Sequence, residues 1–184
     1  GNYWIDARLE ADITTSGGIG LEYGTPYRGT FDGNGHTMTV DIYRDDGKPC
    51  ALFCYVGDVT IRDLHLKGNI NGGIHSAGLI GYAIDGSSAI TLDRVWVSTD
   101  VSTNDSYVGG IIGLSNKADV YMNDCRFDGS LTTNNNNGGS YAGCIIGWCN
   151  GGGWTFHRVY NCYTSATAWR IWFCADHNSN TGAI

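Results

Sequence analysis

Residues 79–82 read LIGY, and closely similar apolar tracts return as IIGL at 111–114 and IIGW at 145–148. Looser copies are LFCY at 52–55 and WFCA at 172–175. The third residues of the five tracts are 27, 32, 34 and 27 residues apart. A tract that returns at a roughly constant interval is typical of a repeat architecture, in which each copy belongs to one structural unit.

A second tract alternates with the first. It occurs as IRDLHL at 61–66, LDRVWV at 92–97, MNDCRF at 122–127 and FHRVYN at 156–161, and its fourth residues are 31, 30 and 34 residues apart. Two tracts that keep the same period of about 30 residues indicate one repeated supersecondary unit, with loops that absorb the variation in length. We therefore expect an all-β fold, a single-stranded right-handed parallel β-helix (β-solenoid) of about five coils.

The second tract also predicts where each coil turns. Its apolar residues occupy positions one, four and six, which fits neither strict alternation nor a helical period. A corner at positions two and three would point those side chains outward and restore the alternation after it. Stacked coils would then align the third positions in a column of Asp63, Arg94, Asp124 and Arg158. Alternating charges at sheet spacing attract one another, so this column would help to fix the register of the coils.

The glycines of the first tract have a structural and a functional interpretation. Gly81, Gly113 and Gly147 occupy the same position in three copies. Glycine suits tight corners and places where two backbones approach closely. A phosphate-binding loop would need a following Lys and a helix that starts there, and the sequence predicts neither. We therefore assign these glycines a structural role.

The whole chain, residues 1–184, is expected to form one β-helix domain. Residues 1–49 would form the N-terminal segment and the first coil, residues 50–175 the repeated coils, and residues 176–184 a C-terminal tail. The chain has 28 Gly, only 2 Pro and 16 % charged residues. This composition fits a turn-dense all-β protein better than a helical one.

Charge and hydropathy argue against two classes of partner. The net charge is −7 at pH 7, and the 11 Lys and Arg residues form no basic cluster. Nucleic acids and anionic membrane surfaces would require such a cluster, so neither is an expected partner. No apolar run reaches 18 residues, and we therefore expect no insertion into a membrane.

Seven cysteines are many for a domain of this size, yet they lack the paired short spacings of a zinc site. They stand at positions 50, 54, 125, 144, 149, 162 and 174. The odd number leaves at least one unpaired. A buried thiol behaves as a small hydrophobe. The sequence leaves two arrangements open, which are buried thiols throughout, or one or two disulfides among mostly buried thiols.

A specific block precedes the repeated tracts. Residues 27–42 read YRGTFDGNGHTMTVDI, and together with the Leu-Ile-Gly and Ile-Ile-Gly tracts this block resembles the GLUG-motif proteins of bacterial cell surfaces. The segment around residues 11–14 is similar to the one that precedes the FDGNGHTI block of that family. The resemblance therefore spans about Tyr3 to Ala175. Cys54 and Cys174 depart from the family pattern, which has glycine at these positions.

This resemblance implies a right-handed β-helix from a surface or secreted protein. The family includes adhesin-like proteins and non-catalytic regions of IgA-cleaving metallopeptidases. An extracellular or cell-surface location is therefore expected. The resemblance brings no catalytic residue with it.

The stretch Asp32-Gly33-Asn34-Gly35-His36 is the strongest candidate for metal chemistry, because its alternating oxygen and nitrogen donors look like the start of a metal loop. An EF-hand would need a Glu at the twelfth position, where Tyr43 stands. A tight Asx turn with two glycines explains the same residues without a metal. We assign the stretch a structural role and expect neither a metal nor a cofactor.

No catalytic residue is expected either. The sequence contains no HEXXH motif, and no acid or nucleophile can be placed beside His36. Right-handed β-helices include polysaccharide lyases and hydrolases, which makes a carbohydrate-active enzyme the rival class. Such enzymes need clustered carboxylates. The densest ionic group, in residues 41–48, is typical of an exposed turn.

Aromatic residues are the better indication of function. Six Trp and eleven Tyr exceed what a solenoid interior of Ile, Val and Leu requires. We predict that Trp96, Trp148 and Trp154 contact a ligand, together with Asn135 and Asn136 in a polar insertion. Two structural alternatives remain open: the late aromatic residues cap the final coil, and the insertion is only a spacer.

The sequence therefore favours a non-catalytic module of a bacterial surface or secreted protein, which binds a glycan or a host or cell-surface protein, or spaces other domains. One alternative is a structural subunit whose open solenoid ends stack head to tail into an extracellular filament. The other alternative is a carbohydrate-active β-helix enzyme.

Overall fold

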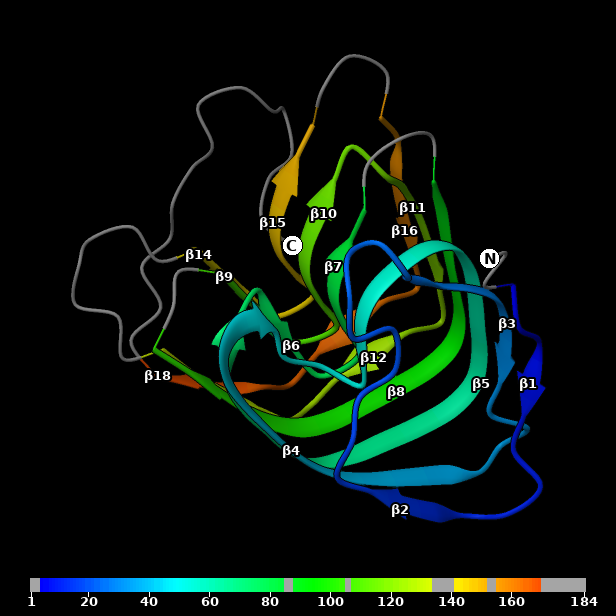
Figure 1. Ribbon diagram of the computed structural model, residues 1–184, viewed down its shortest axis with the longest axis horizontal. Helices are drawn as coiled ribbons and strands as arrows, with labels where there is room; N and C mark the ends of the chain where they lie inside the picture. The colour runs from blue at the N-terminus through cyan, green and yellow to red at the C-terminus, as the bar shows by residue number, and fades with distance from the viewer. Residues whose placement is uncertain (1–3, 85–87, 105–106, 134–140, 152–154, 170–184) are drawn as a thin grey trace.

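The computed structural model describes residues 4–84, 88–104, 107–133, 141–151 and 155–169 (Figure 1). In these residues the secondary structure consists of β-strands. The strands are β1 (Ala7–Arg8), β2 (Ile13–Thr15), β3 (Tyr27–Asp32), β4 (Thr37–Pro49), β5 (Phe53–Ile74), β6 (Ser76–Ala77), β7 (Ile80–Ala83), β8 (Ala89–Thr103), β9 (Tyr107–Gly109), β10 (Ile112–Asn116), β11 (Asp119–Asn123), β12 (Arg126–Phe127), β13 (Ser130–Thr133), β14 (Tyr141–Gly143), β15 (Ile146–Asn150), β16 (His157–Tyr160), β17 (Tyr163–Thr164) and β18 (Thr167–Trp169).

The strands stack as a β-solenoid of about four turns with a period near 30 residues, which confirms the predicted fold class. Strand β5 pairs in parallel with β8, and β8 pairs in parallel with β11, so that Ile61, Leu92 and Met122 lie one above another. A smaller parallel sheet contains β6, β9 and β14. The expected fifth copy of the first tract, at 172–175, lies outside the described residues.

The core fills the interior of the coils. In β5, the side chains of Ile61, Leu64 and Leu66 are buried, whereas Arg62 is exposed and Asp63 is half-buried. The chain therefore turns a corner at the second and third positions of the tract and resumes alternation after it, as the pattern predicts. Each fully buried Ile or Leu stabilises the fold by roughly 1.5–3 kcal/mol relative to an exposed one.

One column of residues makes this corner in successive coils. Asn34, Asp63, Arg94, Asp124 and Asn161 have φ angles of 51–53°, in the left-handed region. Asn and Asp tolerate this region better than other residues with a side chain, because their short polar groups bond locally to the backbone. Four of the five corner residues are Asn or Asp, which explains why the chain turns at the same place in each coil.

The predicted corner column is right at three positions and wrong at the fourth. Arg158 lies three residues before the corner, which Asn161 occupies instead. The sequence pattern suggests Phe156 as the first inward residue of this coil, but the side chain of Phe156 is 47 % exposed. Val159 stacks on Met122 and sets the register. Burial of the aliphatic side chain therefore decides the alignment of this coil.

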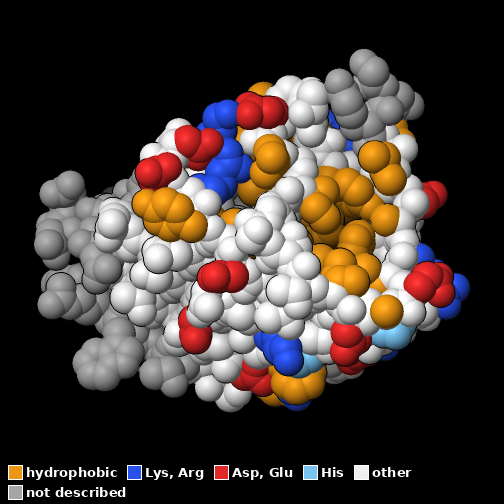
Figure 2. All heavy atoms as spheres, turned by 60° about the horizontal axis from the view of Figure 1, so that its bottom comes forward, with side chains coloured by type: hydrophobic (Ala, Val, Ile, Leu, Met, Phe, Trp, Pro, Cys, Tyr) orange, Lys and Arg blue, Asp and Glu red, His pale blue; other side chains and the backbone are white. Residues whose placement is uncertain are grey.

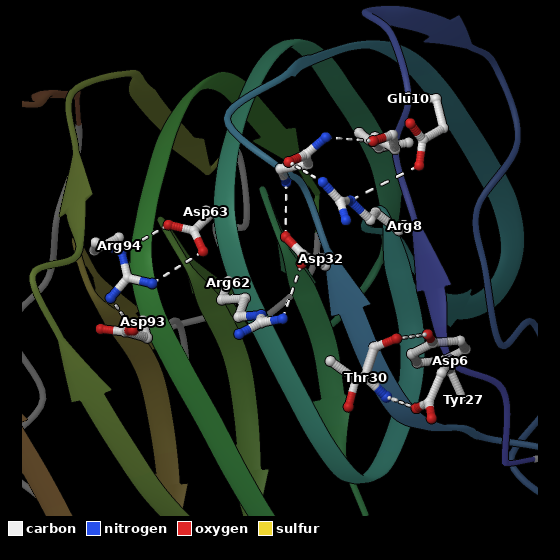
Figure 3. A network of polar contacts seen from close by, with 12 residues as sticks. Asp6, Arg8, Glu10, Tyr27, Thr30, Asp32, Arg62, Asp63, Asp93 and Arg94 are labelled. Atoms are coloured by element: carbon white, nitrogen blue, oxygen red, sulfur yellow. Dashed lines mark hydrogen bonds and ion pairs between the residues drawn. The ribbon is translucent and has the colours of Figure 1, made fainter.

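Ionic contacts connect the first coils on the outside of the corner, as the close-up in Figure 3 shows. Arg94 donates to both carboxylate oxygens of Asp63, at 2.6 and 2.9 Å, and also bonds to Asp93. Arg62 donates to Asp32 at 2.9 Å. Exposed ion pairs of this kind contribute about 0–1 kcal/mol each. Their main effect is on register, because a slipped coil would lose its opposite charges.

Large hydrophobic side chains are exposed at both ends of the described stack. Trp4, Ile5, Ile13 and Leu21 at the N-terminal end are 40–56 % exposed, and Figure 2 shows a hydrophobic patch bordered by charged side chains. In the last described coil, exposed aromatic side chains are Phe156, Tyr160 and Tyr163. Within the described residues, β1 pairs only with β3 and β16 only with β11, so each end also presents strand edges.

Candidate functional site

The predicted ligand contacts fall into two separate ring networks. Trp148 lies on β15 and Trp96 lies on β8, and each contacts a different set of aromatic residues. Trp154, Asn135 and Asn136 lie outside the described residues. The two networks around Trp148 and Trp96 are therefore the surfaces to compare.

The network around Trp148 begins with a column on consecutive strands. Tyr55 pairs with Tyr82, Tyr82 with Leu114, and Leu114 with Trp148, each in parallel register. All four are the fourth residue of the first tract, directly after the position that is Gly81 in the second copy. Because neighbouring coils are about 4.8 Å apart, the column from Tyr55 to Trp148 spans about 14 Å.

A second column comes from the smaller sheet. Tyr107 of β9 pairs with Tyr141 of β14, and their rings are stacked with an interplanar angle of 7° and centroids 5.3 Å apart. The ring of His75, directly before β6, has its centroid 4.9 Å from that of Tyr107. The sheet of β6, β9 and β14 lies near β7, β10 and β15 (Figure 1), and ring contacts such as that between His75 and Tyr82, with centroids 5.3 Å apart, show that the two columns lie side by side.

Ring contacts join the two columns into what we call the aromatic band. Its members are Tyr23, Tyr55, His75, Tyr82, Tyr107, Tyr141 and Trp148. The centroid of Trp148 lies 3.9 Å from that of Tyr141 and 4.8 Å from that of Tyr107, in edge-to-face geometry. At the other end Tyr23 contacts two rings and is 51 % exposed. The band runs along the coil axis from the N-terminal region to the last described coil.

Polar groups accompany the band. The Asn116 side-chain amide donates to the Tyr82 hydroxyl at 2.9 Å, and the Asn150 side-chain amide donates to the Asn116 side-chain oxygen Oδ1 at 2.7 Å. Near Tyr55, Lys48 forms an ion pair with Glu22. Burial raises the pKa of the Tyr55 hydroxyl, which therefore stays protonated at neutral pH. Apolar faces beside fixed amides and hydroxyls are typical of a site that binds a polar organic ligand.

The glycines of the first tract allow this arrangement. A Cβ atom on Gly113 would lie 2.4 Å from the carbonyl oxygen of His75, and one on Gly147 would lie 2.5 Å from that of Val108. A Cβ on Gly81 would lie 3.1 Å from the His75 carbonyl oxygen. These glycines therefore let the chain that carries the second column lie directly against the first.

Sequence reasoning predicted Trp148 but missed most of the band. The missed signal is a longer repeat that starts four residues before each Leu-Ile-Gly or Ile-Ile-Gly tract. It reads HSAGLIGY at 75–82, YVGGIIGL at 107–114 and YAGCIIGW at 141–148. The first and eighth positions of this repeat form the two columns. Aromatic residues at both positions of a repeat unit predict two neighbouring aromatic columns.

The network around Trp96 is different, and we call it the stacked column. His65, Trp96, Arg126 and Tyr163 pair in parallel register on successive coils. The His65 ring stacks on one face of the indole with centroids 3.9 Å apart, and the Arg126 guanidinium carbon lies 3.3 Å from the centroid of the indole ring. The indole N–H donates to Asp128 at 2.8 Å.

The neighbours of Trp96 favour a structural role for this residue, and its predicted ligand contact stays a prediction. Its register places it between His65 and Arg126, which lie over the two faces of the ring, while 37 % of the residue stays exposed. A sugar or a side chain that stacks on an aromatic ring needs a free face. The sequence could place Trp96 outside the core, but it could not reveal which neighbours would cover the ring. We therefore expect Trp96 to stabilise the stack of coils through these contacts.

The stacked column makes stability depend on pH. Burial, together with Lys67, lowers the pKa of His65. The unfolded chain therefore takes up this proton at a higher pH than the folded chain, and stability is lost as pH falls below about 6.5. We expect the urea midpoint of the wild type to drop more between pH 7 and pH 5 than that of His65→Gln. Equal drops in the two proteins would contradict this role of His65.

The Asp32–His36 stretch forms the predicted turn. The Asn34 backbone N–H donates to the Asp32 carboxylate at 2.8 Å, and the His36 N–H donates to the Gly33 carbonyl at 2.8 Å. The Asn34 side-chain amide donates to the carbonyl oxygen of Leu9 at 3.1 Å. Among the described residues, no group of three or more His, Cys, Asp or Glu side chains could hold a metal ion. The turn therefore connects the first coil to the N-terminal strand.

A solvent-open hollow lies beside this turn. Its lining residues include Asp6, Arg8, Asp32 and Arg62. Asp32 accepts from Arg62, and Asp6 accepts from the backbone N–H of Thr30 at 2.7 Å, so the carboxylates are already partnered (Figure 3). A ligand would have to displace these contacts, which makes the hollow a weaker candidate than the aromatic band.

No described segment forms a helix that could span a membrane. Comparison of the chain with protein-family models, with curated proteins and with solved structures finds no match.

Proposed function

We propose that the chain is a non-catalytic β-helical module of a bacterial surface or secreted protein, and that it binds an extended glycan along the aromatic band. The observation that carries this proposal is the continuous series of seven ring residues that follows the coil axis. The resemblance of residues 27–42 to GLUG-motif proteins supports the same class of function.

A glycan suits this surface for physical reasons. Sugar rings have apolar faces of C–H groups and polar edges, and aromatic rings with a polar tip match both. The repeat of the coils is about 4.8 Å, which is close to the length of one sugar unit in an extended chain. The amides of Asn116 and Asn150 form a hydrogen-bonded pair at the edge of the band, where hydroxyls of a sugar chain would bond. A linear chain could thus meet similar groups at each coil.

The test is a glycan-array screen of the purified chain, followed by calorimetry with oligosaccharides of increasing length from the best class. We expect affinity to rise with chain length and to level off once the oligosaccharide spans the band. A folded, monomeric protein that binds no glycan would reject the proposal and would favour a protein partner or a spacer. Affinity that does not depend on length would reject the extended mode.

The exposed ends of the stack favour a second candidate function, a subunit that stacks head to tail. Ile13 and Leu21 are 40 % and 46 % exposed at one end, and Tyr160 is 61 % exposed at the other. Open strand edges accompany both sets of side chains within the described residues. Sedimentation velocity over a range of concentrations tests this candidate. Growing end-to-end species would support it, and a constant monomer would reject it.

A further inference from the structure

In the part of the chain that the structure describes, one pair of core cysteines lies on adjacent coils. Arg126 pairs with Tyr163 in parallel register, which places Cys125 directly against Cys162, the residues before them. The Tyr163 backbone N–H donates to the carbonyl oxygen of Cys125 at 3.2 Å, so the two coils are hydrogen-bonded at this point. The spacing of about 4.8 Å between adjacent strands lies inside the Cα–Cα range of disulfides, about 4.4–6.8 Å.

The two thiol side chains have the same orientation on adjacent coils. Cys125 Sγ donates to the carbonyl oxygen of Asn123 at 3.2 Å, and Cys162 Sγ donates to that of Tyr160 at 3.1 Å. The same side-chain orientation thus recurs one coil apart, which places the two sulfur groups next to each other. Both side chains belong to the inward column that continues from Val95.

We propose that Cys125 and Cys162 form a disulfide that links the last described coil to the one before it. The position of the pair in the fold supports this role. Among the described residues, β17 pairs only with β12, and Tyr160 and Tyr163 beside the pair are 61 % and 54 % exposed. This coil therefore has few contacts to hold it, and a covalent link there would oppose its local unfolding.

Solvent access and pKa indicate which of the two thiols reacts first when the disulfide forms. Cys125 is fully buried, whereas Cys162 is partly exposed. The interaction between the two neighbouring sulfur groups lowers the pKa of the Cys162 thiol, and the same interaction together with burial raises the pKa of Cys125. Cys162 is thus the accessible thiol that more readily forms a thiolate, and the thiolate is the nucleophile in disulfide exchange.

Oxidised glutathione can supply the oxidising equivalents. The Cys162 thiolate attacks one glutathione sulfur, the glutathione S–S bond breaks, and a glutathione thiolate leaves. Cys125 then gives its proton to solvent and attacks the sulfur of Cys162, which releases the second glutathione thiolate. Two protein thiols are oxidised and one glutathione disulfide is reduced to two thiols.

Peptide mapping of the wild-type protein tests the link without any substitution. The chain is incubated with oxidised glutathione, alkylated and digested with trypsin under non-reducing conditions. Cleavage after Lys117, Arg126, Arg158 and Arg170 places the two cysteines in peptides 118–126 and 159–170. We expect these peptides to be recovered as one linked species that reduction separates. Recovery as separate alkylated peptides, or linked to other cysteines, would overturn the proposal.

Variants test the consequence for stability. Oxidation is expected to raise the thermal midpoint of the wild type by about 5–10 °C. Cys125→Val and Cys162→Val, which copy Val95 in the same column, should abolish this rise. Cys144→Ala is the matched control, since Cys144 is partly exposed on another strand connection, and it should keep the rise. A rise that persists in Cys162→Val would overturn the assignment. The inference is independent of glycan binding, because neither cysteine belongs to the aromatic band.

Discussion

Gly113→Ala is expected to lower the free energy of unfolding by about 3 kcal/mol. The added Cβ would lie 2.4 Å from the carbonyl oxygen of His75 and 2.8 Å from that of Gly81. Both contacts are with backbone atoms, which cannot turn away as a flexible side chain can. To make room, the segment of His75 must move away from β10, and this movement breaks the ring contacts that connect the two columns of the aromatic band.

Urea unfolding followed by far-UV circular dichroism and by tryptophan fluorescence measures this effect. Gly24→Ala is the matched control, because no atom lies within 4 Å of a Cβ at Gly24. It should change the unfolding free energy by less than about 0.5 kcal/mol. If Gly113→Ala were as stable as the control, the close approach of the His75 segment to β10 would be wrong.

The architecture was predictable because two independent tracts carry it. The tract at 61–66 has apolar residues at positions one, four and six, and this pattern is satisfied only when the chain turns at Arg62 and Asp63. The burial pattern and the left-handed φ angle thus place the corner at the same residues. When local conformation and core packing agree in this way, the fold can be predicted from the sequence pattern.

The fourth coil shows where pattern reasoning fails. The run Phe156-His157-Arg158-Val159 has apolar residues at positions one and four, like the true tract, and the sequence alone gives no reason to shift it. The register depends on which side chains fill the interior below Met122 and Cys125. Val159 and Cys162 occupy these positions, where they pack against the core in register with Met122 and Cys125. Three-dimensional packing therefore decided between two similar alignments.

The candidate site was only partly predictable for a related reason. An aromatic residue that points away from the core can be recognised from its place in a strand, as for Trp96, but the covering of its faces depends on residues about 30 positions away. Trp96 has His65 and Arg126 as neighbours, which stack on it. Trp148 has edge contacts with Tyr107 and Tyr141. Two tryptophans with the same prediction therefore receive different roles.

Trp148→Ala is expected to weaken glycan binding at least about tenfold, whereas Trp96→Ala should change affinity less than about twofold. A tenfold loss corresponds to about 1.4 kcal/mol, which is ordinary for an aromatic contact residue in a binding surface. The difference follows from the ring environments, because Trp148 belongs to the band and Trp96 is stacked between two neighbours. Calorimetric titration with the best oligosaccharide from the array measures both affinities.

Thermal stability must be measured in the same two variants, because we expect Trp96→Ala to lose more stability than Trp148→Ala although it loses less affinity. Trp96→Ala removes the stacking of His65 and Arg126 and the hydrogen bond to Asp128, so it should lower the thermal midpoint. Trp148→Phe keeps an aromatic ring in the band and should retain most of the affinity lost in Trp148→Ala. Loss of binding in Trp96→Ala, with Trp148→Ala unaffected, would place the ligand on the stacked column, since the two surfaces share no ring.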